Sequence, residues 1–257
     1  MKKTSAKKGK KQQKRFSGPD NRRAPAGPID EAVAQGQRDT VSEIVSGGKT
    51  AASALEVALS AIIRADHLMA RFEAENPLPK PLACHSGCDC CCYNQIEVTP
   101  PEALLLGDYV AKNFSQEDRQ ALTARLERLA GIKAGKTKTE IARLRQGLPC
   151  PFLAVGKCTV YPVRPLVCRA MHALDAGQCE AALASPYLLA VEHYSHRRIF
   201  TMSVVKGLLD GCRALGCQAG SLDLAGALQD FCAQPHPLER WIQGEQVFSR
   251  LSSLTWK

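Results

Sequence analysis

The stretch CHSGCDCCC, residues 84–92, holds five of the twelve cysteines in this 257-residue chain. Neighbouring cysteines rarely meet the Cα separation and the side-chain direction that a disulfide needs, so bridges between them are not expected. Thiolates packed this closely suit a soft metal, because the cation offsets the repulsion between the sulfur charges. The stretch therefore predicts a loop that ligates a metal ion or an iron–sulfur cluster.

A second cysteine segment follows at residues 150–169, with the sequence CPFLAVGKCTVYPVRPLVCR. Its three thiols, Cys150, Cys158 and Cys168, are separated by proline and glycine. Such spacing suits a looped chain that returns to one site, as in zinc sites and clusters assembled from separated segments. A proline directly after a cysteine also turns the chain away from the metal, as in bacterial ferredoxins. The segment is expected to complete the site begun by the first loop.

Two arginines, Arg164 and Arg169, accompany the second segment. We expect them beside the sulfur atoms, where a guanidinium donates hydrogen bonds to thiolates or neutralises their excess charge. The alternative for either arginine is a surface position or a carboxylate partner.

The two segments together resemble the YkgJ-type cysteine-cluster proteins. The spacing Cys-x3-Cys-x2-Cys-Cys is similar to the first half of their module, and Cys-Pro-Phe-Leu, Gly-x-Cys and Tyr-x-x-Arg-Pro-x-x-Cys-Arg are similar to its second half. The resemblance covers residues 84–169 and implies a zinc- or iron-chelating domain. Flagellin lysine-N-methylase carries a similar module and is thought to use an iron–sulfur cluster in methyl transfer. The residues that match the module are Cys84, Cys88, Cys91, Cys92, Cys150, Cys158 and Cys168, with Arg164 and Arg169 beside them.

Seven thiols exceed the four that one zinc ion or one cubane cluster takes. Either Cys91 or Cys92 is a spare, or the centre is larger than a single four-ligand site. Two complete four-cysteine sites need eight thiols and would recruit Cys90, which falls at a spacer position of the pattern, or Cys179. The number of centres stays open at this point.

Other potential ligands have plainer interpretations. His85 and His172 lie beside the cysteines as alternative ligands, but exposure or packing is the expectation for each. Buried packing positions are expected for a further set of cysteines, since free cysteine behaves as a small hydrophobe: Cys179, Cys212, Cys217 and Cys232.

Net charge is concentrated at the start of the chain. Residues 1–28 contain ten Lys and Arg and one Asp, whereas the following 229 residues contain 24 basic and 24 acidic side chains. With Phe16 as its largest apolar residue, this segment is expected to be a disordered basic tail. It could bind a polyanion weakly and without sequence preference, or serve only as a solubilising extension.

Helical patterns dominate the remaining sequence. The fold class expected is mainly α, with one helical domain over residues 29–257 and the cysteine segments, residues 82–170, as irregular metal-binding loops. Residues 96–98 are expected to be extended. Helices are expected over residues 30–46, 50–75, 222–231 and 238–251. The helix over 50–75 is expected to have a capping box formed by Ser53 and Glu56. Three more helices are expected to begin at N-cap residues 99, 115 and 137.

The sequence offers neither a secretory signal nor eighteen consecutive apolar residues, so we expect a cytoplasmic chain with no membrane contact. Thiols stay reduced in that compartment, which favours metal binding over disulfides.

Three functions are compatible with these patterns. The first is an iron–sulfur protein with a redox or accessory role. The second is a structural zinc module that presents a surface to an unknown protein partner. The third is an iron–sulfur-dependent protein-lysine methyltransferase, although a glycine-rich nucleotide loop and a Ser/His/Asp order are not evident.

Overall fold

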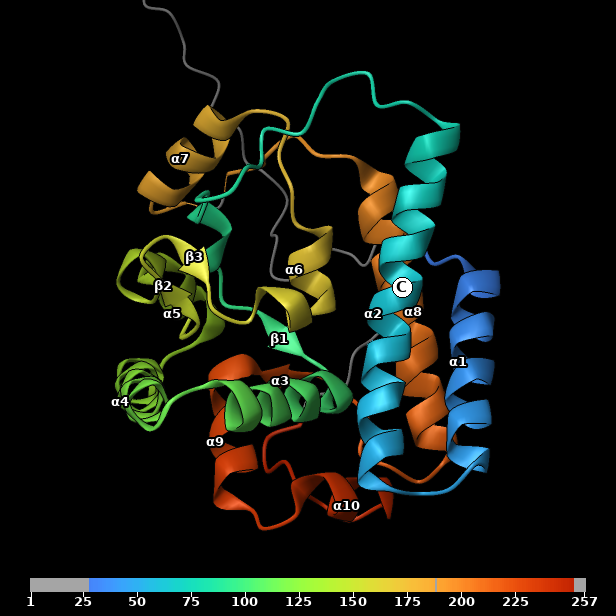
Figure 1. Cartoon of the computed structure of the whole chain (residues 1–257). Helices are drawn as coiled ribbons and strands as arrows, with labels where there is room; N and C mark the ends of the chain where they lie inside the picture. The colour runs from blue at the N-terminus through green and yellow to red at the C-terminus, as the bar shows by residue number, and fades with distance from the viewer. Residues whose placement is uncertain (1–27, 188, 252–257) are drawn as a thin grey trace, which may run out of the picture.

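The computed structural model describes residues 28–187 and 189–251 (Figure 1). The predicted disordered tail lies outside this range, except for residue 28, and its proposed polyanion binding stays a prediction. Ten α-helices and four two-residue strands occur in the described part, which confirms the mainly α class. None of these helices has both the length and the apolar character needed to cross a membrane.

A layer of three helices forms one side of the molecule (Figure 1). It consists of α1 (Glu31–Ser46), α2 (Ala51–Glu75) and α8 (Ser195–Ala214), which pack against one another. Asp30 caps α1 by accepting hydrogen bonds from the first-turn amides. The predicted capping box of α2 was wrong by one turn: Thr50 is the N-cap and pairs with Ser53, because the chain turns at the two preceding glycines.

Glycines set the distance between α1 and α8. A Cβ atom at Gly207 would lie 2.0 Å from the carbonyl oxygen of Ala34, and one at Gly211 would lie 2.7 Å from Cβ of Val41. Both distances are shorter than van der Waals contact. At Gly207 the backbone of α8 therefore meets the backbone of α1, and at Gly211 it meets the side chain of Val41; neither position has room for a Cβ atom.

A second group of helices packs beside this layer and supplies much of the core. It contains α3 (Pro100–Asn113), α4 (Gln116–Lys133), α9 (Leu224–Ala233) and α10 (Pro237–Ile242). The expected helix over residues 238–251 was too long, because the chain turns at Gly244, where φ is +89°. The expected helix over 222–231 begins instead with β4 (Leu222–Asp223), which pairs antiparallel with β1 (Glu97–Val98).

Short elements surround the cysteines. They are η1 (Cys90–Tyr93), α5 (Lys138–Arg143), η2 (Arg145–Gly147), β2 (Leu153–Ala154), β3 (Lys157–Cys158), η3 (Tyr161–Val163), α6 (Leu166–Ala170) and α7 (Ala176–Ala184). The sequence therefore correctly predicted irregular cysteine loops on a helical frame.

Candidate metal centre

One cavity of about 590 Å³ collects the predicted thiols. Its lining includes all seven cysteines of the predicted ligand set, although they come from two segments about sixty residues apart. Fold geometry thus brings both segments to one place. The seven are Cys84, Cys88, Cys91, Cys92, Cys150, Cys158 and Cys168.

A backbone hydrogen bond joins the two cysteine segments. The first loop ends in the 3₁₀ turn η1, where the amide of Cys92 donates to the carbonyl of Asp89. The carbonyl of Cys92 then accepts from the amide of Cys150 over 2.7 Å. This bond fixes the start of the second segment beside the end of the first.

A tight hairpin places Cys158 near Cys150. Strands β2 and β3 pair so that Leu153 lies opposite Cys158. The turn between them consists of Val155 and Gly156, with φ of 49° and 70°. Both angles are positive, as in the type I′ turn that forms the two-residue loop of many β-hairpins, in which Asn-Gly is the favoured pair.

The hairpin turn contains a local conflict between sequence and structure. Val155 is 99% exposed, so its side chain gains nothing from packing, and a β-branched residue is strained at positive φ. Replacing it by asparagine is expected to stabilise the fold by about 1 kcal/mol, measured as free energy of unfolding in urea.

A matched control for this prediction is Ile63→Asn, which removes another exposed apolar side chain (65% exposed) from α2, where backbone angles are helical. No gain in stability is expected there. A Val155→Asn protein no more stable than the wild type would contradict the strain argument.

A buried carboxyl group positions Cys168. Glu102, the third residue of α3, accepts hydrogen bonds from the amide and hydroxyl of Thr99, which forms a capping box at the cap predicted for residue 99. Its other oxygen accepts from the amide of Leu166 over 2.7 Å. The same side chain therefore caps both α3 and α6, the helix that carries Cys168. Burial raises the pKa of Glu102, whereas its hydrogen bonds oppose that shift.

Burial opposes ionisation of four thiols of the cavity, Cys91, Cys150, Cys158 and Cys168. Burial raises the pKa of Cys150 to about 11 and that of Cys168 well above its usual range, and nearby thiols add to both shifts. The pKa of Cys91 is raised first by its hydrogen bond with Cys92 and then by burial. Forming several thiolates here requires a cation, and a bound metal supplies that charge.

Comparison with protein families identifies this part of the chain. Residues 83–186 match the family model CxxCxxCC, described as "Putative zinc- or iron-chelating domain". This segment, called the CxxCxxCC domain below, is similar to that family, and the match covers less than half of the chain. Comparison with curated proteins and with solved structures gave no match. The family match confirms the predicted cysteine-cluster resemblance as a zinc- or iron-chelating domain, and a link to YkgJ-type proteins in particular stays a prediction.

The CxxCxxCC domain has the donor chemistry that a soft metal needs, because seven thiols line its cavity. No three His, Cys, Asp or Glu side chains within the described ranges are arranged to hold an ion as they stand. Binding therefore requires cysteine side chains to turn toward a common point. The assignment of each cysteine as a ligand stays a prediction.

Arg164 lines the same cavity as the seven thiols, and its role beside the sulfur atoms stays a prediction. Its guanidinium stacks over the ring of Tyr161, with 4.2 Å from Cζ to the ring centroid. Its Nε is buried without a hydrogen-bond partner within the described residues. Its positive charge also lowers the pKa of Cys158, against the larger opposing effect of burial. An orphaned donor beside thiols fits a centre that carries negative charge.

Arg169 takes a different position from the predicted one. Its guanidinium donates to the carbonyls of Arg164 and Pro162 and pairs with Asp66 on α2 over 2.5 Å. In place of contacting sulfur, it holds the loop before α6 and links the CxxCxxCC domain to the helical layer. The carboxylate partner that the sequence left as an alternative is the one found.

His85 and His172 are exposed or packed, as expected from the sequence. His172 has both ring nitrogens engaged: Nε2 accepts from the amide of Tyr194 over 2.7 Å, so Nδ1 carries the proton and donates to the carbonyl of Ala170. It therefore offers no free lone pair to a metal. His85 is exposed, and its Nδ1 lies 3.0 Å from the carbonyl of Ser86.

The remaining cysteines divide into two groups. Cys212 and Cys217 are buried in the core, as predicted. The packing interpretation was wrong for Cys232, which is exposed, and for Cys179, which is half-buried. Cys179 lies on α7 and lines a smaller cavity together with Cys90. Its sequence separation from the first loop left no local signal of this proximity.

Proposed function

We propose that the CxxCxxCC domain holds an iron–sulfur cluster on these cysteines and has a redox or accessory role. The observation that carries the proposal is the convergence of seven thiols and the unpartnered donor of Arg164 on one cavity. One zinc ion and one cubane cluster each take four thiolates, so seven thiols leave room for more than one of either. Clusters are also tuned by hydrogen bonds to their sulfur atoms, and the unpartnered Nε of Arg164 is a donor suited to that role. A reducing, cytoplasmic environment would keep these thiols available for the cluster.

The deciding experiment is the composition of the protein purified without oxygen. Iron, acid-labile sulfide and zinc are measured on the same sample, with the visible absorption spectrum. We expect iron and sulfide in similar amounts and charge-transfer absorption in the visible range. Stoichiometric zinc with neither iron nor visible absorption would replace the proposal by its alternative, a structural zinc module that fixes the loops and presents a surface to a protein partner.

Arg164 gives a finer test of the proposed centre. Arg164→Gln removes the positive charge that lines the thiol cavity, and we expect metal affinity to fall about tenfold. Affinity is measured by competition with a chelator. Arg38→Gln is the control, because Arg38 is exposed on α1 and lines neither cavity. Equal metal retention by the two variants would remove Arg164 from the centre.

A further inference from the structure

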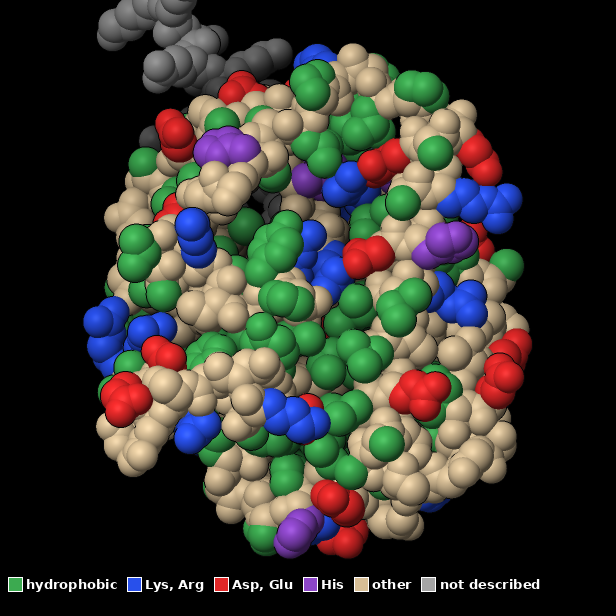
Figure 2. Space-filling view, viewed as in Figure 1, with side chains coloured by type: hydrophobic (Ala, Val, Ile, Leu, Met, Phe, Trp, Pro, Cys, Tyr) green, Lys and Arg blue, Asp and Glu red, His purple; other side chains and the backbone are tan. Residues whose placement is uncertain are grey.

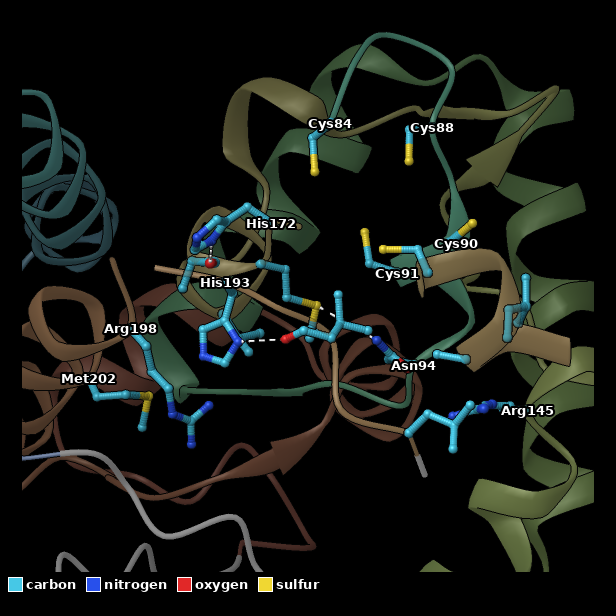
Figure 3. A pocket seen from close by; sticks show the side chains of 18 residues that line it. Cys84, Cys88, Cys90, Cys91, Asn94, Arg145, His172, His193, Arg198 and Met202 are labelled. Atoms are coloured by element: carbon cyan, nitrogen blue, oxygen red, sulfur yellow. Dashed lines mark hydrogen bonds between the residues drawn. The ribbon is translucent and has the colours of Figure 1, made fainter. Parts of the chain in front are cut away.

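A second chamber lies beside the first cysteine loop. It has a volume of about 300 Å³, and Cys84, Cys88 and Cys91 form one of its walls. The sulfur atoms of Cys84 and Cys88 point toward that of Cys91 (Figure 3). Figure 2 shows a hollow in the surface between α7 and α6, the two helices that contribute further walls. Because the same three cysteines also line the larger cavity, an occupant of the chamber would lie next to the proposed metal centre.

Cationic and neutral side chains line the chamber, and none of its lining residues is Asp or Glu. Arg198, on α8, has no hydrogen-bond or ion-pair partner among the residues that the structure describes. The preceding residue, Arg197, differs, since it binds both carboxylate oxygens of Glu73. The fold therefore neutralises one of two adjacent arginines and leaves the charge of the other facing the chamber (Figure 3).

A second guanidinium lines the chamber from another direction. Arg145 is only 7% exposed, and its Nη2 donates to the carbonyls of Ser185 and Tyr187. Its Nε is buried with no partner in the described part of the chain. Leaving a buried donor unsatisfied costs about 1–3 kcal/mol, more for a charged group. No acidic group balances either arginine from within the chamber, so the site favours an anion.

Apart from Asn94, His172 and His193, the remaining walls are cysteine and apolar side chains. A chamber of about 300 Å³ corresponds to roughly ten water-sized groups, enough for a short organic molecule. Its occupant would contact thioether and aliphatic side chains along its length. These walls come from Met171, Leu183, Leu189, Val191 and Met202.

We propose that this chamber binds a small organic carboxylate with an apolar chain. The carboxylate is held by Arg198, with the positive field of Arg145 behind it, and the chain packs along the methionine and leucine walls. Bound in this way, the molecule lies against Cys84, Cys88 and Cys91, so the chamber is the place where the proposed metal centre would meet a small-molecule substrate or effector. That last step rests on the proposed function, whereas binding of the carboxylate does not.

The test uses two probes of equal chain length and opposite charge, hexanoate and hexylammonium. Each is titrated calorimetrically into the full-length protein as purified. Hexanoate is expected to bind at least tenfold more tightly than hexylammonium, because a charge-assisted hydrogen bond replaces repulsion. Failure of hexanoate to bind, or equal or tighter binding of hexylammonium, would overturn the proposal. Tighter binding of the amine would favour a lysine-like substrate instead.

Two variants localise the binding. Arg198→Gln is expected to weaken hexanoate binding at least tenfold, whereas Arg38→Gln leaves it unchanged. Ala182→Phe keeps all charges but fills the chamber from α7 and is expected to abolish binding. Unchanged binding by both chamber variants would overturn the proposal.

Metal content is measured on every sample used in these titrations. The proposed metal centre fails if the wild-type protein contains no iron, and the hexanoate titration still decides whether the chamber binds a carboxylate. Conversely, a protein that contains the metal but does not bind hexanoate would support the proposed metal centre and contradict carboxylate binding in the chamber. The two failures therefore give different results.

Discussion

Removal of the metal is expected to unfold the cysteine loops while the helical layer persists. The elements around the cavity are short: η1 has four residues, α6 has five, and β2 and β3 have two each. Elements of this length are not stable by themselves. Metal binding at such sites contributes directly to folding, on the order of 10 kcal/mol for structural zinc. Chelation should therefore abolish part of the cooperative unfolding transition and expose amides of residues 82–170 to hydrogen exchange.

Cys150→Ser tests at one residue whether metal binding stabilises the cysteine loops. The Cys150 amide bonds to Cys92, so the substituted residue stays at the junction of the two segments while its sulfur is lost. We expect loss of bound metal and a clearly lower melting temperature. Cys232→Ser is the matched control, since Cys232 is exposed and lies outside both cavities. A Cys150→Ser protein with full metal content and an unchanged melting curve would reject Cys150 as a ligand.

The features that the sequence predicted well are those that depend on local spacing. The cysteine segments have a dense pattern in the sequence, and their predicted members line one cavity. Helix starts at Thr99, Ser115 and Thr137 were also predicted, because each cap binds amides within its own first turn. A residue that interacts with neighbours three positions away leaves a readable signal.

The features that the sequence analysis missed depend on distant partners. Helix α8 was not singled out: its N-cap, Tyr194, makes no side-chain capping bond, and its interior contains two glycines that lower helix propensity. The partner of Arg169, Asp66, is 103 residues away. Cys179 likewise joins the first loop only through the placement of α7. Such contacts follow from the packing of the whole chain, which no local pattern encodes.

Gly207→Ala is expected to be among the most destabilising single-methyl additions in the described part of the protein. The added Cβ would lie 2.0 Å from the Ala34 carbonyl oxygen and 2.8 Å from Cβ of Gln37, so α1 must move away from α8. Both obstacles belong to backbone or to a buried side chain, which cannot swing aside. Overpacking of this kind costs about 3 kcal/mol or more, which outweighs the roughly 1 kcal/mol that alanine gains in helix propensity.

Gly131→Ala separates these two effects. Gly131 lies within α4, and an added Cβ there would meet no atom within 4 Å. With no overlap to oppose it, helix propensity alone should stabilise the protein by about 0.5–1 kcal/mol. Urea unfolding of both variants, followed by circular dichroism, gives the two free energies. Opposite signs are expected for the same substitution, and a Gly207→Ala protein as stable as the wild type would mean that α1 and α8 do not pack as closely as described. Helix α8 also carries Arg198, which lines the chamber. A different packing of α8 against α1 would therefore also change the position of Arg198 in the chamber.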